Sequence, residues 1–262
     1  MITVTSAQLS AWLALFIFPF VRILAMIASA PILGNRQVPV RIKVGLSILL
    51  TIVIAPTLAT QPNVDPASAL GFLVIIQQIL AGLAIGFTMR LIFTAIEMAG
   101  DIIGIQMGLG FAIFFDPKNS SYVPVIAQFL GILAVLIFLS LNGHLLMLEA
   151  LVDSFSTFPV NSTTSSAIAL HTLVSWGGSI FSNALQLSMP VIGTLLMANA
   201  ALGILTRSAP QLNILAVGFP ITLTVGFAAV LLSLPYIVPL LENIIHASLN
   251  TIQHVMQLLG KS

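Results

Sequence analysis

Long apolar runs separated by short polar turns make up most of this sequence. The runs cover residues 9–33, 44–60, 67–104, 123–148, 168–205 and 214–241. A helix that crosses a bilayer needs about 20 predominantly apolar residues, and most of these runs reach that length. The pattern therefore predicts an all-α, multi-helix integral membrane subunit with long kinked helices and hairpins.

The third run, residues 67–104, changes character along its length. As a helix it would extend about 55 Å, well beyond a hydrocarbon core of roughly 30 Å. The polar residues of its second part share one helical face, because their spacings are four, three and four. They are Arg90, Thr94, Glu97 and Asp101. We expect this face to meet water or a partner, since no third group makes the two carboxylates an acid–base pair.

Glycines recur at four-residue spacing in and after this run. They are Gly82 and Gly86, followed by Gly100, Gly104 and Gly108. Small residues at this spacing let two helices approach each other closely. The series predicts close helix crossings along the third run.

One charged side chain, Arg22, lies in the middle of the first run. An arginine inside a membrane span costs on the order of 3 kcal/mol or more, so it should face protein or water. Two interpretations are open at this stage. Arg22 either forms a structural ion pair with another helix or subunit, or it belongs to a functional ion site.

The composition excludes several classes of protein. The chain is 58% hydrophobic and only 6% charged, whereas soluble domains carry about 25% charged residues. The net charge of +1 and the absence of a basic run argue against a nucleic-acid partner. There is no cysteine, and His144 and Glu149 lack the spacing of a zinc helix. We therefore expect no enzyme, no cofactor and no metal site.

The distribution of cations predicts an orientation. With the N-terminus outside, six runs place most lysines and arginines on the cytoplasmic side, as the positive-inside rule requires. These cations are Arg36, Arg41, Lys43, Arg90, Lys118 and Arg207. The tail after Glu242 is amphipathic, and we expect it to lie on another subunit or on a membrane surface.

Residues 100–124, GDIIGIQMGLGFAIFFDPKNSSYVP, form the most unusual stretch. A glycine-rich helix end leads into an apolar cluster that is too short to span a bilayer, and then into a polar turn. Irregular apolar backbone persists at membrane depth only where protein or a cavity accepts it. The stretch is either a flexible hydrophobic loop folded back into a larger assembly or a re-entrant segment with no special role.

Three segments resemble the FliR family, the R subunit of the flagellar type III export gate, which is related to the T subunit of virulence injectisomes. They are PILGNRQVPVRIKVGLS, QMGLGFAIFFDPKNSSYVP and LTRSAPQLNILAVGFP. The resemblance runs from about residue 16 to 240, and the turn at residues 207–213 is its most specific part. It implies a channel subunit with a P-subunit-like part, residues 1–160, and a Q-subunit-like hairpin and tail, residues 161–262.

The resemblance also implies a site. Residues 106–122 would form a plug loop that closes the pore, and its named residues are Gln106, Met107, Gly108, Gly110, Phe111, Phe114, Phe115, Asp116 and Pro117. A hairpin tip would lie at the cytoplasmic entrance, near the export switch protein. Its residues are Arg207, Pro210, Gln211 and Asn213.

By the same resemblance, the partners are the P and Q subunits, the export switch protein, the large export-gate protein, unfolded flagellar substrates and lipid. The location is the bacterial inner membrane at the centre of the flagellar basal body, with part of the helical body raised towards the periplasm. The alternative is a secondary transporter of small solutes or ions that uses Arg22 and the face of residues 90–101.

Overall fold

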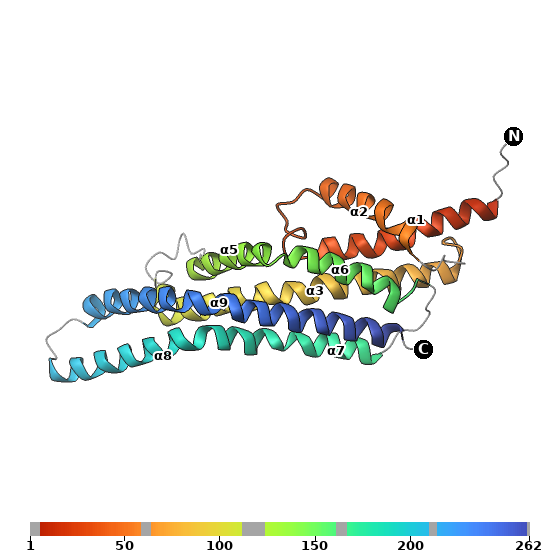
Figure 1. Cartoon of the computed structure of the whole chain (residues 1–262). Helices are drawn as coiled ribbons and strands as arrows, with labels where there is room; N and C mark the ends of the chain where they lie inside the picture. The colour runs from red at the N-terminus through yellow and green to blue at the C-terminus, as the bar shows by residue number, and fades with distance from the viewer. Residues whose placement is uncertain (1–5, 59–63, 112–123, 161–166, 210–213, 261–262) are drawn as a thin grey trace. The chain divides into compact units, whose positions relative to one another are not determined.

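The structure is a computed structural model that describes residues 6–58, 64–111, 124–160, 167–209 and 214–260. All regular secondary structure in these ranges is helical (Figure 1), which confirms the predicted all-α class. The helices are α1 (Ser6–Ser29), α2 (Val40–Ile54), α3 (Ala69–Gln106), α5 (Val125–Ser140), α6 (Gly143–Thr157), α7 (Ala167–Gly177), α8 (Ser179–Ser208) and α9 (Ile214–Gly260). Two short 3-10 turns cover Ala55–Thr57 and Leu109–Phe111.

Five helical stretches are long and apolar enough to cross a membrane, so this is a transmembrane protein. They are Gln8–Ser29, Val40–Thr57, Ala69–Gln106, Ala167–Ser208 and Val217–Gly260. A sixth candidate combines α5 and α6, but the pair is bent at the short break between them. Asn142, at this break, has a φ of 55°, a left-handed conformation that asparagine tolerates better than most residues.

The helices group into two compact units. Unit 1 comprises Met1–Leu91, Asn142–Gly177 and Ile245–Ser262, and unit 2 comprises Ile92–Leu141 and Gly178–Ile244. The long helices α3 and α9 contribute to both units. The family resemblance divides the chain near residue 160, into a part similar to the P subunit and a part similar to the Q subunit. The two units above are defined by contacts within this chain, so they do not test that division, and it stays a prediction.

In unit 1, α1 and α3 cross with their main chains in contact. A Cβ added at Gly82 would lie 3.0 Å from the amide nitrogen of Met26. One added at Gly86 would lie 2.6 Å from the carbonyl oxygen of the same residue. The first two glycines of the series therefore form the close helix crossing that their spacing predicts.

The C-terminal tail is not a separate surface helix but the last part of α9, which also continues through Pro220, Pro235 and Pro239. Its apolar side chains are buried, among them Ile252, Val255 and Met256. This corrects the expectation of a tail lying on another subunit or on a membrane, because the apolar face is already covered within this chain. In Figure 1 the tail runs beside α7.

Unit 2 contains the first part of α9 alongside α8, together with the end of α3 and helix α5 (Figure 1). Phe93 on α3 and Phe138 on α5 pack edge to face, with ring centroids 5.4 Å apart. This arrangement is favoured by the aromatic quadrupole. It fixes α5 against α3 near the segment that the sequence singles out.

Candidate functional site

The C-terminal end of α3 is a sharp helix stop built around Gly108. The amide of Met107 still donates to the carbonyl oxygen of Ile103 at 2.9 Å, and the amide of Gly108 donates to that of Ile105 at 3.0 Å. Gly108 has a φ of 86°, which costs a glycine little because it has no Cβ. The helix therefore ends here, and the chain turns directly into the following 3-10 turn.

Met107 is fully buried against α9, within unit 2. A Cβ placed on Gly226 would lie 2.6 Å from the Cγ and 2.9 Å from the Cε of Met107. The thioether side chain therefore occupies the space that a side chain at residue 226 would need. One turn earlier on α9, the hydroxyl of Thr222 lies 3.4 Å from the carbonyl oxygen of Met107, while its shorter hydrogen bond, at 3.0 Å, goes to the carbonyl oxygen of Phe219 in its own helix. We call Thr222 and Gly226 the Met107 seat.

The start of α5 packs directly on the last turns of α3. A Cβ added at Gly100 would clash with the Cα of Ala127 and lie 2.7 Å from its amide nitrogen. Both are main-chain atoms, so the two helices approach as closely as their backbones allow. At Gly104, one turn later, the nearest atoms, from Ile126 and Leu109, are at an ordinary 3.8 Å. The chain thus leaves α3 and enters α5 at neighbouring points of unit 2.

The structure describes only the first of the predicted plug residues. Gln106 ends α3, Met107 is buried in its seat, Gly108 makes the turn, and a Cβ at Gly110 would meet nothing within 4 Å. The side chain of Phe111 and the whole of Phe114, Phe115, Asp116 and Pro117 lie outside the described residues. The plug therefore stays a prediction, and the structure gives a geometry only for its first residues, 106–111.

The predicted hairpin tip joins α8 to α9. Arg207 is exposed in the last turn of α8, where a cation is favoured by the helix dipole. The amide of Ala209 caps this end by donating to the carbonyl oxygen of Leu205 at 2.9 Å. The other predicted tip residues, Pro210, Gln211 and Asn213, lie outside the described residues.

Arg22 is completely buried and surrounded by acceptors of unit 1. Its Nε donates to the Oε1 of Gln78 at 2.7 Å. Its Nη1 donates to the carbonyl oxygen of Ser154 at 2.8 Å and to its Oγ at 3.1 Å. Its Nη2 donates to the carbonyl oxygen of Phe158 at 2.8 Å, and its Cζ lies 4.2 Å from the ring centroid of Phe155.

These contacts explain how a cation is accommodated at this depth. The two carbonyls lie at the C-terminal end of α6, which carries a partial negative charge. That of Ser154 also accepts the amide of Phe158, the residue that caps the helix, at 2.9 Å. The prediction that Arg22 faces protein is confirmed. Within the described part of the chain its hydrogen-bond partners are neutral, so helix-end carbonyls take the place of the ion pair that we expected.

The charged face of α3, residues 90–101, is partly exposed, whereas Arg22 is completely buried. Arg90 and Glu97 are exposed, and Asp101 is half-buried. The carboxylate of Glu97 lies beside Gly131 of α5, 3.7 Å from the position of an added Cβ. This agrees with a face that meets water or a partner, as its spacing indicates.

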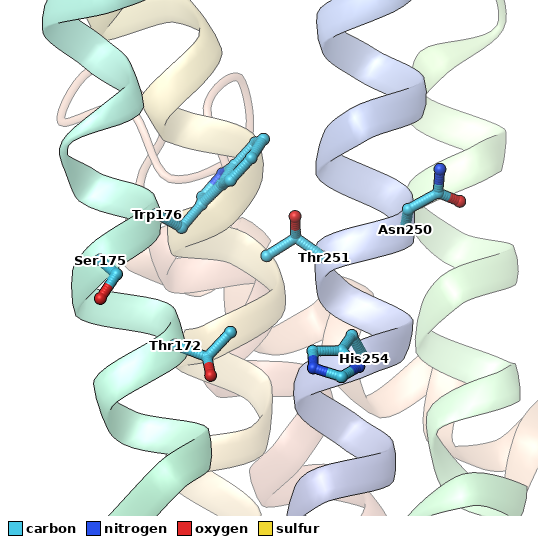
Figure 2. Close-up of a pocket in the computed structure, with 6 residues that line it drawn as sticks. All are labelled: Thr172, Ser175, Trp176, Asn250, Thr251 and His254. Atoms are coloured by element: carbon cyan, nitrogen blue, oxygen red, sulfur yellow. The ribbon is translucent and has the colours of Figure 1, made fainter.

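A groove between α7 and the last part of α9 was not anticipated from the sequence (Figure 2). It has a volume of about 460 Å³ and is lined by Thr172, Ser175, Trp176, Asn250, Thr251 and His254. Figure 2 shows Thr172, Trp176, Thr251 and His254 pointing into the space between the two helices.

The groove contains no acid–base pair. The threonine hydroxyls donate within their own helices, Thr172 to Ile168 at 2.8 Å and Thr251 to Ala247 at 2.9 Å. The indole nitrogen of Trp176 is buried and has no hydrogen-bond partner among the described residues. None of the lining residues is acidic, and His254 is their only titratable side chain. The groove therefore offers no catalytic chemistry.

The helices bring together no metal site either. Within the described ranges, no three histidine, aspartate or glutamate side chains come together closely enough to hold a metal ion. The described chemistry is thus that of a helical scaffold with two firmly held points, Arg22 in unit 1 and Met107 in unit 2.

Known proteins resemble the whole of this chain. The family model for bacterial export proteins, family 1, matches residues 13–248. The flagellar biosynthetic protein FliR of Pectobacterium carotovorum subsp. carotovorum is 44% identical over 263 residues, covering 100% of both chains. FliR of Escherichia coli (strain K12) is 43% identical over 256 residues, covering 98% of each. FliR of Bacillus subtilis (strain 168) is 29% identical over 251 residues, covering 94% of this chain and 96% of the relative. The chain therefore belongs to the FliR family of bacterial export proteins.

Proposed function

We propose that this chain is a structural channel subunit of the flagellar type III protein export gate in the bacterial inner membrane. Its relatives carry the name of a flagellar biosynthetic protein, and its family is one of bacterial export proteins. Five candidate membrane spans support a location in the membrane. In this role the chain builds the wall of a conduit for unfolded flagellar proteins and catalyses no reaction.

Uncovered apolar surface supports assembly with other subunits. In the apolar part of Ala167–Ser208, only 11% of the residues are buried within this chain, and in that of Val40–Thr57 only 17% are. Gly193 and Gly203 on α8 have nothing within 4 Å of their Cβ positions, which leaves room for a neighbouring helix. We assign these surfaces to the P and Q subunits and to lipid. The end of α8 near Arg207 is assigned to the export switch protein and the large export-gate protein.

We further propose that residues 106–122 are the plug that closes the pore at rest. The observation that carries this proposal is the root of the segment, where buried Met107 is followed at once by left-handed Gly108. The contact of Gly100 with Ala127 fixes the return of the chain nearby. A segment held at both ends can move without disturbing the helices that carry it. Apolar side chains on such a segment would seal the pore by excluding water and ions.

We place the gate at the centre of the flagellar basal body, with part of its helices raised out of the membrane towards the periplasm. A subunit whose apolar faces are covered by protein as well as lipid needs less membrane contact than its hydropathy implies.

The experiment that tests the plug is replacement of residues 108–122 by a short Gly-Ser linker. We expect a membrane that leaks ions while the subunit still co-purifies with its P and Q partners.

The leak is measured as loss of membrane potential in cells and as ion flux through the purified complex in vesicles. The matched control replaces residues 161–166, outside the proposed plug, with Gly-Ser residues and should leave ion permeability unchanged. An intact complex that stays ion-tight after the replacement of residues 108–122 would contradict the plug.

The transporter alternative loses its main support. A solute site needs a polar group that the solute can reach. Arg22 has no exposed surface, and each of its three nitrogens already donates a hydrogen bond. Solute flux through vesicles that contain only this chain would restore the alternative.

A further inference from the structure

The contact between Met107 and its seat on α9 gives the proposed plug a specific mechanical property. We propose that Met107 is a fixed anchor of the export conduit, held by Gly226 and Thr222 in both the closed and the exporting states, so that any movement begins at Gly108. This inference rests on the proposed function, because it concerns the root of the same segment.

Packing at the seat supports an anchor. Met107 has no exposed surface, and its Cγ, Cε and Sδ all lie within 3.0 Å of the Cβ position of Gly226. Protein interiors are close-packed, and the thioether fills the space against α9 that a side chain at residue 226 would need. The hydroxyl of Thr222 donates to the carbonyl oxygen of Phe219 at 3.0 Å and lies 3.4 Å from that of Met107, so the packed side chain is the main attachment of Met107 to α9.

The backbone separates the anchor from the segment beyond it. The amide of Met107 still belongs to the hydrogen-bond ladder of α3, through the carbonyl oxygen of Ile103. Met107 is the first residue after α3, and Gly108 follows it with a φ of 86°, in a region where glycine moves with little steric restriction. Two residues later, Gly110 has open space around its Cβ position. Gly108 is therefore the first point beyond the seat at which the backbone can turn with little steric restriction.

A disulfide across the seat tests this inference, because the natural chain contains no cysteine. A Cβ at residue 226 lies 2.6 Å from the Cγ of Met107, and that Cγ is about 1.5 Å from its own Cβ. The two Cβ atoms are thus within about 4 Å, which suits a disulfide. The double variant Met107→Cys, Gly226→Cys is assembled in the full gate. It is then treated with copper phenanthroline and oxygen, which accepts two electrons and two protons from the two thiols.

We expect the cross-link to form in assembled gates, and export of flagellar proteins in the oxidised state to stay within about two-fold of the reduced state, because close-packed anchors do not move. Two results would overturn the anchor. One is an assembled gate in which the two cysteines do not react. The other is a cross-link that stops export until a reductant breaks it, since Met107 would then have to leave its seat.

Three controls accompany the test. The variants Met107→Cys and Gly226→Cys, made singly, report what each substitution does without a cross-link. The pair Met107→Cys, Gly193→Cys should not react, because the Cβ position of Gly193 has nothing within 4 Å.

The replacement of residues 108–122 is tested in parallel. If it produces no leak while the cross-link forms and export continues, the plug fails and the anchor stands. If it leaks while the cross-link blocks export, the anchor fails and the plug stands.

Discussion

Two buried side chains of this protein are held in opposite ways. Arg22, in unit 1, is fixed by hydrogen bonds from each of its three nitrogens to acceptors on α3 and at the end of α6. Met107, in unit 2, is fixed mainly by shape, in the space that Gly226 leaves open. Loss of the cation would leave buried acceptors unpaired, whereas loss of the thioether would remove only van der Waals contacts. The comparison predicts that the site of Arg22 is sensitive to the loss of hydrogen-bond donors and that the site of Met107 is sensitive to changes in side-chain volume.

The largest effect is expected from Arg22→Met, which replaces the guanidinium by a shorter apolar side chain and removes its donors. The carbonyl oxygen of Phe158 and the amide oxygen of Gln78 would lose this partner, and the carbonyl oxygen of Ser154 would keep only the amide of Phe158, at 2.9 Å. We expect a loss of stability of about 3 kcal/mol or more, since each unpaired buried acceptor is costly. The measurement is the fraction of assembled complex that survives a temperature series in detergent.

Arg22→Lys is the matched control for this variant. It retains the charge but replaces the planar fork of donors with a single nitrogen, so its loss should be smaller than that of Arg22→Met. If Arg22→Met were as stable as the natural chain, the hydrogen bonds around Arg22 would contribute nothing and the comparison would lose its first half.

A smaller effect is expected from Gly100→Ala, where the added Cβ meets the main chain of Ala127. Main-chain atoms cannot rotate away, so α3 and α5 would have to separate. Overpacking of this kind costs about 2 kcal/mol. Gly104→Ala, one turn along the same helix, meets only contacts of 3.8 Å and should be neutral or slightly stabilising. Equal stability of the two variants would show that α3 and α5 are not in close contact.

The smallest effect is expected from Gly226→Ala. The new methyl group would meet Met107, whose unbranched side chain adapts more readily than a backbone does. We expect a loss of about 1 kcal/mol for Gly226→Ala and of about 2–5 kcal/mol for Met107→Ala, which empties a buried site. The double variant should lose less than the sum of the two single losses, because the methyl group at residue 226 fills part of the space that Met107 leaves. Strictly additive losses would contradict a direct contact between these residues. Gly193→Ala, in open space on α8, serves as the control.

The sequence predicts the elements of this fold better than their pairing. Long apolar runs predict the helices because hydrophobic content and length are local properties of a chain. The burial of Arg22 could also be predicted, since a cation in a span must face protein or water. Its actual partners could not, because Ser154 and Phe158 lie 132 and 136 residues further along.

The same limit applies to the candidate site. The glycine series correctly indicates close contacts at Gly82, Gly86 and Gly100. The seat of Met107 has no local signal, because Thr222 lies 115 residues away in another apolar run. The break at Asn142 interrupts a run that is long and apolar enough to be taken as one span. Its local marks are the Asn142–Gly143 dipeptide, which is typical of turns, and the polar residues Ser140 and His144.

The partners of Arg22 also set an order of events during synthesis. When α1 enters the membrane, the ribosome has not yet translated α6, and only Gln78 follows soon afterwards. The nascent first helix therefore carries a guanidinium with its main acceptors missing until residue 158 has been made. Unit 1 can therefore enclose this charge only after α6 has been made.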